Sequence, residues 1–253
     1  MDCDILSSNK EYWDSYADNW LELGRATVLP QYGVALTEDS LRLFGDVSGK
    51  KLLDICCGSG HSMQYHADRG AAELWGLDIS HTQIAFADEH LKRHGYTAKL
   101  ICSPMEADAG IPVDYFDCVY SVYGIGWTTD LEGTFRKIAS YLKKDGIFIF
   151  SWHHPLNYCV AWSIPERRVV MEDGKLVFHR SYFDESWFRM PVDGSEITLC
   201  NRKISTYVNA LAGAGFAVEQ MIELPAQSIG DDSDNAQKAR MLPISVCFKA
   251  RKL

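Results

Sequence analysis

The chain has 253 residues, enough for one α/β domain with an elaboration or for two small domains. Hydrophobic residues make up 47% of it, so it can bury a sizeable core, yet no run approaches the ~20 apolar residues of a membrane span. The net charge of −9 argues against a nucleic-acid surface, and the acidic start lacks the basic region of a signal peptide. We therefore expect a cytoplasmic protein with no membrane or nucleic-acid partner.

Residues 8–23 are predicted to form a helix that carries an aromatic stripe of Tyr12, Trp13, Tyr16 and Trp20. Tyr12, Tyr16 and Trp20 are spaced by four residues and so share one face. Such a face either packs permanently against the core or closes over a bound ligand, and the sequence leaves both interpretations open. Further along, Thr37-Glu38-Asp39 is typical of a helix start and Gly45 of a helix end.

The following segments alternate between strands and helices, which is typical of a parallel sheet covered on both faces. Apolar runs predict strands at 51–55, 73–77, 98–102, 116–122 and 147–152. Segments with helical character predict helices at 62–69, 82–94 and 130–142, the last of them closed by residues 143–146.

The pattern changes after Pro155. Two Asp-Gly pairs, at 173–174 and 193–194, each stand between β-like runs and predict hairpins, so residues 156–201 are expected to form a small antiparallel β insertion. Beyond the insertion, the sequence predicts a helix at 204–212, a strand at 217–224, an acidic irregular loop at 225–242 and a strand at 243–250. With only a loop between them, the last two strands should pair antiparallel.

The segment from Leu53 to His61 carries the clearest functional signal. An apolar strand enters a loop that contains Gly58 and Gly60, and a helix follows. Glycines let a ligand approach the backbone closely, and the first N–H groups of a helix are free to bind it. Asp78 ends the next strand, 20 residues after Gly58, where nucleotide-binding folds place the carboxylate that binds a ribose diol.

The order and spacing of these motifs resemble the class I S-adenosylmethionine-dependent methyltransferases, in particular the broad bacterial group related to the ubiquinone and menaquinone biosynthesis methyltransferases. The resemblance covers most of residues 8–155 and 202–253 and implies a cofactor-binding domain there. It implies a Rossmann-like sheet of seven strands, mostly parallel, with an antiparallel last strand. The insertion at 156–201 would then lie on the substrate side, where it would govern acceptor choice and leave the cofactor alone.

The same resemblance implies S-adenosylmethionine as the cofactor, S-adenosylhomocysteine as the product, and roles for single residues. Asp54 and the glycine loop match the first motif of the family, with Cys56 in place of its most common glycine. Asp78 would bind both ribose hydroxyls, and Ile79 would pack on the adenine.

Adenine recognition departs from the family pattern. Pro104 stands where the family usually carries an acid near the adenine amine, which leaves the Met105 backbone and the Glu106 side chain as alternative contacts. The full set of expected cofactor-binding residues is Tyr16, Trp20, Asp54, Cys57, Gly58, Gly60, Asp78, Ile79, Met105, Glu106 and Ser121.

Two histidines are candidates for catalysis. His153 and His154 follow the fifth strand, where the sheet opens toward substrate. A histidine there could orient or deprotonate a nucleophile, or it could be a hydrogen-bonded structural residue before Pro155.

Methyl transfer from a sulfonium is an in-line displacement that mainly requires alignment, and aromatic faces suit the cationic donor. We expect a small, partly apolar acceptor in an aromatic pocket, with candidates Tyr16, Trp20, Tyr123, Trp127, Trp162, Tyr182 and Trp187.

Two other functions fit parts of the pattern. An NAD-dependent oxidoreductase would use a similar fold, but the segment Gly58 to Met63 lacks the third glycine of the dinucleotide fingerprint. A non-catalytic protein that keeps S-adenosylmethionine as a ligand would carry the same cofactor residues.

The chain has eight cysteines. Cys56 and Cys57 are adjacent rather than spaced as CxxC, so we expect reduced structural thiols and no metal site.

Overall fold

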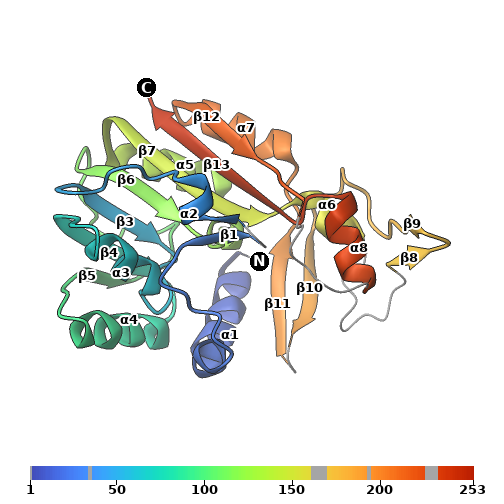
Figure 1. Ribbon diagram of the computed structural model, residues 1–253, viewed down its shortest axis with the longest axis horizontal. Coiled ribbons are helices and arrows are strands. Elements are labelled where there is room, and N and C mark those ends of the chain that lie inside the picture. The colour runs from blue at the N-terminus through green and yellow to red at the C-terminus, as the bar shows by residue number, and fades with distance from the viewer. Residues whose placement is uncertain (1, 34–35, 161–169, 193–194, 226–232) are drawn as a thin grey trace.

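The computed structural model describes residues 2–33, 36–160, 170–192, 195–225 and 233–253. Its centre is a sheet of seven strands (Figure 1), which in chain order are β3 (Lys51–Ile55), β4 (Glu73–Asp78), β5 (Lys99–Cys102), β6 (Phe116–Ser121), β7 (Leu142–His153), β12 (Phe216–Ile222) and β13 (Ser245–Lys252). In space their order is β12-β13-β7-β6-β3-β4-β5. β13 pairs antiparallel with both of its neighbours, and the other pairs are parallel. The predicted fold class is confirmed.

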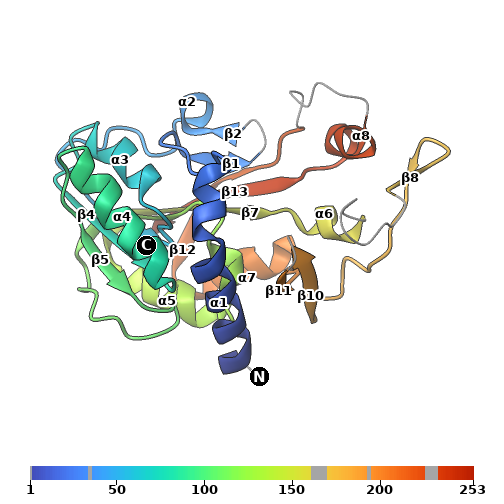
Figure 2. The same ribbon diagram turned by 90° about the horizontal axis from the view of Figure 1, so that it is seen from below.

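Helices cover both faces of this sheet, which explains why its strands are apolar on both sides. In β3, Leu52 packs into one core cluster, with residues of α3 (His61–Ala67) and α4 (His81–Arg93). Leu53 packs into the other cluster, with residues of α5 (Leu131–Tyr141) and α7 (Ile204–Gly213). Figure 2 shows α3 above the sheet and α5 and α7 below it. Among the described residues, no helix is both long and apolar enough to cross a membrane.

The N-terminal part differs from the prediction in detail. Helix α1 (Asp2–Glu22) begins six residues before the predicted start at residue 8. A short antiparallel pair, β1 (Gln31–Gly33) and β2 (Leu36–Thr37), was not predicted. Helix α2 (Glu38–Leu41) starts where expected but ends before Gly45, because Arg42 takes a left-handed backbone conformation with φ of 50°.

The insertion contains the predicted hairpins. After α6 (Pro155–Cys159), β8 (Met171–Glu172) pairs antiparallel with β9 (Lys175–Leu176) across the turn at 173–174. The strands β10 (Trp187–Val192) and β11 (Ser195–Cys200) form a longer hairpin, and the pair at 193–194 that was predicted to turn it lies outside the described residues. The two hairpins are separate from the central sheet.

Two predictions about irregular segments were wrong. Residues 143–146 do not close a helix but belong to β7, where a register shift against β6 and a φ of 63° at Asp145 absorb the extra residues. Helix α8 (Asp234–Met241) lies within the segment 225–242 that was expected to be an irregular loop. Ser233 caps this helix by accepting from the Ala236 N–H, and Ala236 and Ala239 are buried, so a cap and a small apolar face outweigh the acidic composition.

Candidate functional site

A cavity of about 410 Å³ lies at the carboxyl ends of β3, β4 and β6. Its walls come from the glycine loop after β3, the end of β4, residues 103–106 after β5, the loop after β6, and α1 with the segment that follows it. Ligands of open α/β sheets bind at this edge, because the loops that leave the parallel strands converge there.

The glycine loop owes its shape to left-handed backbone positions. The φ angles are 67° at Cys56, 51° at Gly58 and 76° at Gly60, a region that glycine occupies at little cost. The N–H groups of Cys56 and Cys57 both donate to the Leu77 carbonyl, at 2.7 and 3.0 Å, so the loop turns back onto the end of β4. Cys56 thus keeps the conformation that explains why glycine is the usual residue at its position.

Two carboxyl groups face this cavity from neighbouring strand ends. Asp78 Oδ2 accepts from the Gly58 N–H and Oδ1 accepts from the Ser80 N–H, both at 2.9 Å. Asp54 Oδ2 accepts from the Ser62 hydroxyl at 2.6 Å, whereas its Oδ1 is buried without a hydrogen bond among the described residues. Burial raises the pKa of Asp54 to about 7 and that of Asp78 to about 6, because a dry site disfavours the charged form.

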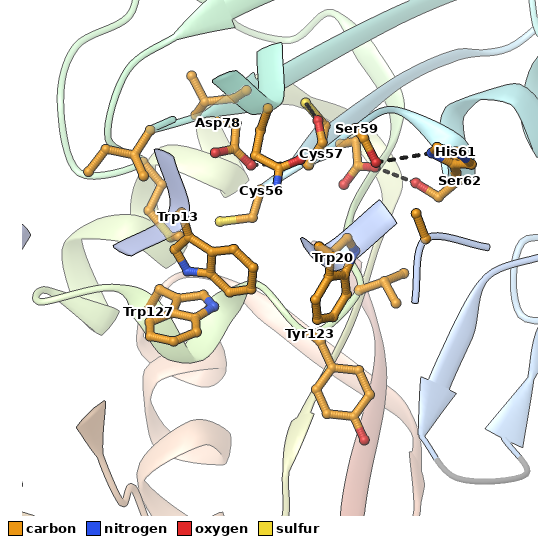
Figure 3. A pocket seen from close by; sticks show the side chains of 18 of the residues that line it. Trp13, Trp20, Cys56, Cys57, Ser59, His61, Ser62, Asp78, Tyr123 and Trp127 are labelled. Carbon is orange, nitrogen blue, oxygen red and sulfur yellow. Dashed lines mark hydrogen bonds between the residues drawn. The ribbon is translucent and has the colours of Figure 1, made fainter. Parts of the chain in front are cut away.

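An aromatic wall, which we define as Trp13, Trp20, Tyr123 and Trp127, lines the cavity across from Asp78 (Figure 3). The Trp13 ring meets Trp20 and Trp127 edge-on, with ring centroids 5.5 Å apart in each case. Trp13 and Trp20 come from α1, and the other two residues come from the loop after β6.

Tyr16 is not part of this wall, and it does not line the cavity in which it was predicted to contact the cofactor. It is buried in the core, stacked on Tyr12 with ring centroids 5.1 Å apart. Tyr12 and Tyr16 are four residues apart and share the core face of α1, whereas Trp13 and Trp20 are seven apart and share the face toward the cavity. The four-residue spacing therefore predicts the helix, but of the three residues it selects only Trp20 lines the cavity.

Most of the other predicted cofactor residues are brought together at the cavity. The lining includes Trp20, Asp54, Cys57, Gly58, Asp78, Ile79, Met105 and Glu106. Gly60 and Ser121 lie outside the lining. A Cβ on Gly60 would stand 3.0 Å from that of Ala87, so glycine there lets the loop pack closely against α4. The Ser121 hydroxyl donates to the Ile55 carbonyl at 2.6 Å and so ties β6 to the end of β3.

Several lining residues were missed by sequence reasoning, among them Trp13, Arg25, His61 and Gln83. Trp13 belongs to the predicted aromatic stripe, but it was not among the residues expected to contact the cofactor. Glu106 is placed as predicted, but its Oε1 accepts from the Thr129 N–H at 2.6 Å, which ties it to the loop before α5.

Neither predicted catalytic histidine lines the cavity. His154 Nδ1 accepts from the Leu156 N–H at 3.1 Å and so caps α6, while its Nε2 lies 2.7 Å from Glu223 Oε1. Both ring nitrogens are therefore engaged in structure, which was the alternative that the sequence left open. The His153 ring stands behind Tyr123, with centroids 5.0 Å apart, and burial lowers its pKa to about 4.

The described aromatic candidates of the insertion do not line the cavity either. Tyr182 and Trp187 are absent from its lining, and Trp162 lies outside the described residues. The cysteines whose side chains are described are free thiols. Among the described residues, no group of three or more histidine, cysteine or acidic side chains is arranged to hold a metal ion.

Comparisons with known proteins agree with this geometry. Residues 53–150 match a family model described as a methyltransferase domain. An uncharacterized protein of Haemophilus influenzae is 27% identical over 222 residues, which is 81% of this chain and 84% of that protein. A ubiquinone biosynthesis O-methyltransferase of Azoarcus sp. is 31% identical over 105 residues, 42% of this chain and 45% of that protein.

The fold has solved counterparts. The crystal structure of a putative S-adenosylmethionine-dependent methyltransferase from Listeria monocytogenes superposes with a TM-score of 0.70 at 24% identity. The match covers 85% of this chain and 96% of that one. The two chains therefore share a fold over nearly the full length of the Listeria protein.

Proposed function

This chain belongs to the class I S-adenosylmethionine-dependent methyltransferases, with S-adenosylmethionine as its cofactor, and from this premise we propose that it methylates a small-molecule acceptor. The observation that carries the proposal is the cavity itself, which joins a glycine loop, two buried carboxyl groups and an aromatic wall at one edge of the sheet. Its volume of about 410 Å³ is near the lower end of the roughly 300–1,000 Å³ of ligand pockets, which favours a small acceptor beside the cofactor.

The residues at the cavity fit this cofactor on chemical grounds. The orphaned Oδ1 of Asp54 is a buried acceptor that suits a cationic or hydrogen-bond-donating group. Each oxygen of Asp78 already accepts one backbone N–H, but a carboxylate oxygen has a second lone-pair site and can also accept from a ribose hydroxyl. Ile79 and Met105 offer apolar surface to the base, and Arg25 offers a cation to a carboxylate at the mouth of the cavity.

S-adenosylmethionine supplies a methyl group that is already activated as a sulfonium. The chain then has to align an acceptor with that methyl group and exclude water, and such alignment is worth on the order of ~7–11 kcal/mol of barrier. The aromatic wall serves both tasks, since its faces attract positive charge and its bulk covers the cavity. Burial raises the pKa of Tyr123 to about 12, and its hydroxyl hydrogen-bonds to Ser245, so Tyr123 stays protonated and does not act as a base.

We assign the acceptor side of the cavity to the insertion at 156–201, as the sequence suggests. The support is positional, because β11 lies beside α1, which forms part of the cavity wall (Figure 1). The rival functions receive no comparable support. The glycine loop lacks the third glycine of NAD-binding folds, and the family match is to a methyltransferase domain.

The test has two stages. Calorimetry with S-adenosylmethionine, S-adenosylhomocysteine and NAD is expected to give the tightest binding for the first two, and tighter binding of NAD would refute the assignment. Small molecules released from the purified protein are then identified by mass spectrometry, and small acceptors are screened for cofactor-dependent gain of 14 Da. Failure of every small acceptor with intact cofactor binding would favour a non-catalytic binding protein.

A further inference from the structure

A buried arginine connects the β10–β11 hairpin to the aromatic wall. Arg202 follows β11 and is only 7% exposed. Its Nη1 donates to the Gly126 carbonyl at 3.2 Å, its Nη2 donates to the Thr128 carbonyl, and its guanidinium lies over the Trp187 ring, 5.6 Å from the centroid. Hydrogen bonds from a charged donor are stronger than those from a neutral donor, and the planar guanidinium group can hold two acceptors in a fixed geometry.

Arg202 thereby holds η1 (Ile125–Trp127), a tightly packed turn of 3-10 helix. A Cβ on Gly126 would fall 1.8 Å from Trp152, and a Cβ on Gly124 would fall 2.4 Å from that of Cys56. Trp127 itself stands edge-on to Trp13 and to Trp152, at 5.5 Å in both cases. A small displacement of η1 therefore moves Trp127 within the cavity.

A second link joins the same hairpin to the other half of the wall. Asn9 of α1 is 4% exposed, and its amide donates to the Thr198 carbonyl and accepts from the Thr198 N–H, both at 2.9 Å. Thr198 lies in β11, and Asn9 lies one turn before Trp13. Figure 2 shows β11 beside α1, so β11 and the residue that follows it hold the two helical segments that carry Trp13, Trp20 and Trp127.

We propose that Arg202 is a positioning residue for cofactor binding and acts through Trp127. This inference rests on the proposed cofactor site. Arg202 directly follows the insertion at 156–201 and reaches the aromatic wall through the carbonyl groups of Gly126, within η1, and Thr128, directly after it.

The test is a double-mutant cycle on cofactor affinity, measured by calorimetry with S-adenosylmethionine. Arg202→Gln should weaken binding about tenfold, whereas in a Trp127→Ala background the same change should add less than about threefold, since its mediator is gone. The matched control is Arg189→Gln on β10 of the same hairpin, where the arginine is 75% exposed and pairs with Glu196. This control should bind within about twofold of the unchanged protein.

A loss that only reflects a weakened fold would be the same in both backgrounds, and such additivity would overturn the proposal, as would an unchanged affinity in folded Arg202→Gln. If Arg202→Gln does not fold, Arg202→Lys takes its place in the cycle. Lysine keeps the buried positive charge but lacks the planar guanidinium group that donates to both carbonyl groups. If the unchanged protein does not bind S-adenosylmethionine, the proposed function fails and not merely the role of Arg202.

Discussion

Asp78 holds the glycine loop of this protein, because its Oδ2 accepts the Gly58 N–H at 2.9 Å while its Oδ1 accepts the Ser80 N–H at the start of α4. One carboxylate thus fixes the loop after β3 and the helix after β4 relative to each other. The acid that is expected to bind the ribose is also the residue that shapes the cavity around it.

Asp78→Ala is expected to weaken S-adenosylmethionine binding by about 2–3 kcal/mol, which is roughly 30- to 150-fold, because charge-assisted hydrogen bonds are lost. Asp78→Asn is the milder variant, since its single carbonyl oxygen still accepts one of the two N–H groups. Calorimetry gives the affinities, and circular dichroism checks that both variants fold. An unchanged dissociation constant in folded Asp78→Ala would rule out the ribose role.

The pH dependence of the empty protein follows from Asp54 and Asp78. Their folded pKa values of about 7 and 6 lie above the ordinary value of 3.8, so the folded state binds more protons than the unfolded state between pH 4 and 7. The free energy of unfolding contributed by these two groups therefore falls as pH rises through that window. In denaturation experiments at a series of pH values, Asp54→Asn should remove about half of this fall between pH 4 and 6, where both groups contribute, and nearly all of it between pH 6 and 7.

Cofactor binding should show the opposite trend with pH. A cationic ligand favours the ionised carboxylates, so binding releases protons, and affinity rises between pH 5.5 and 7.5 (an interval set by the two pKa values of about 6 and 7). Calorimetry in buffers of different ionisation enthalpy counts the protons released. Proton uptake on binding would contradict this account.

Helix α1 should respond to the cofactor only at its C-terminal end. Its earlier turns are anchored by Tyr12 and Tyr16 in the core and by Asp14, whose Oδ1 accepts the Ser80 hydroxyl at 2.6 Å. We expect amides near residues 2–17 to be protected from hydrogen exchange with or without cofactor, and those around Trp20 and Arg25 to gain protection on binding. Rapid exchange along the whole helix in the free protein would indicate a lid that opens as one piece.

Arg25 should contribute to affinity through the carboxylate of the cofactor. It lines the mouth of the cavity but is exposed, so Arg25→Gln is expected to cost about 0.5–1 kcal/mol, or roughly two- to fivefold in affinity. Decarboxylated S-adenosylmethionine lacks the carboxylate and is the control ligand, whose affinity should not change in this variant. An equal loss of affinity for both ligands would indicate that the substitution alters the entrance of the cavity and not a contact with the carboxylate.

His154 is expected to matter for stability rather than for chemistry. His154→Ala removes the cap of α6 and the contact with Glu223, and it should lower the free energy of unfolding by about 1–2 kcal/mol. The rate constant of methyl transfer, once an acceptor is known, should stay within about twofold of the unchanged protein. A large fall in that rate constant with unchanged stability would restore the catalytic interpretation.

The sequence by itself determined the sheet and the loop at its edge. Strands buried on both faces require continuous apolar runs, and a left-handed turn that approaches a ligand requires small residues. Both requirements concern residues that are neighbours in the chain, so the sequence shows them directly. For this reason the sequence predicts β3 with its observed bounds and places Asp54, Gly58 and Asp78 at the edge of the sheet where the cavity lies.

Only the tertiary structure decided which side chains surround the cavity. Whether Tyr16 or Trp13 faces the ligand depends on how α1 is rotated against its neighbours, and the helical period alone fixes a relative angle but not that rotation. The link from Arg202 to Gly126 joins residues 76 positions apart in the chain. No local pattern encodes such a contact, because it exists only once β11 and η1 have packed on the same end of the sheet.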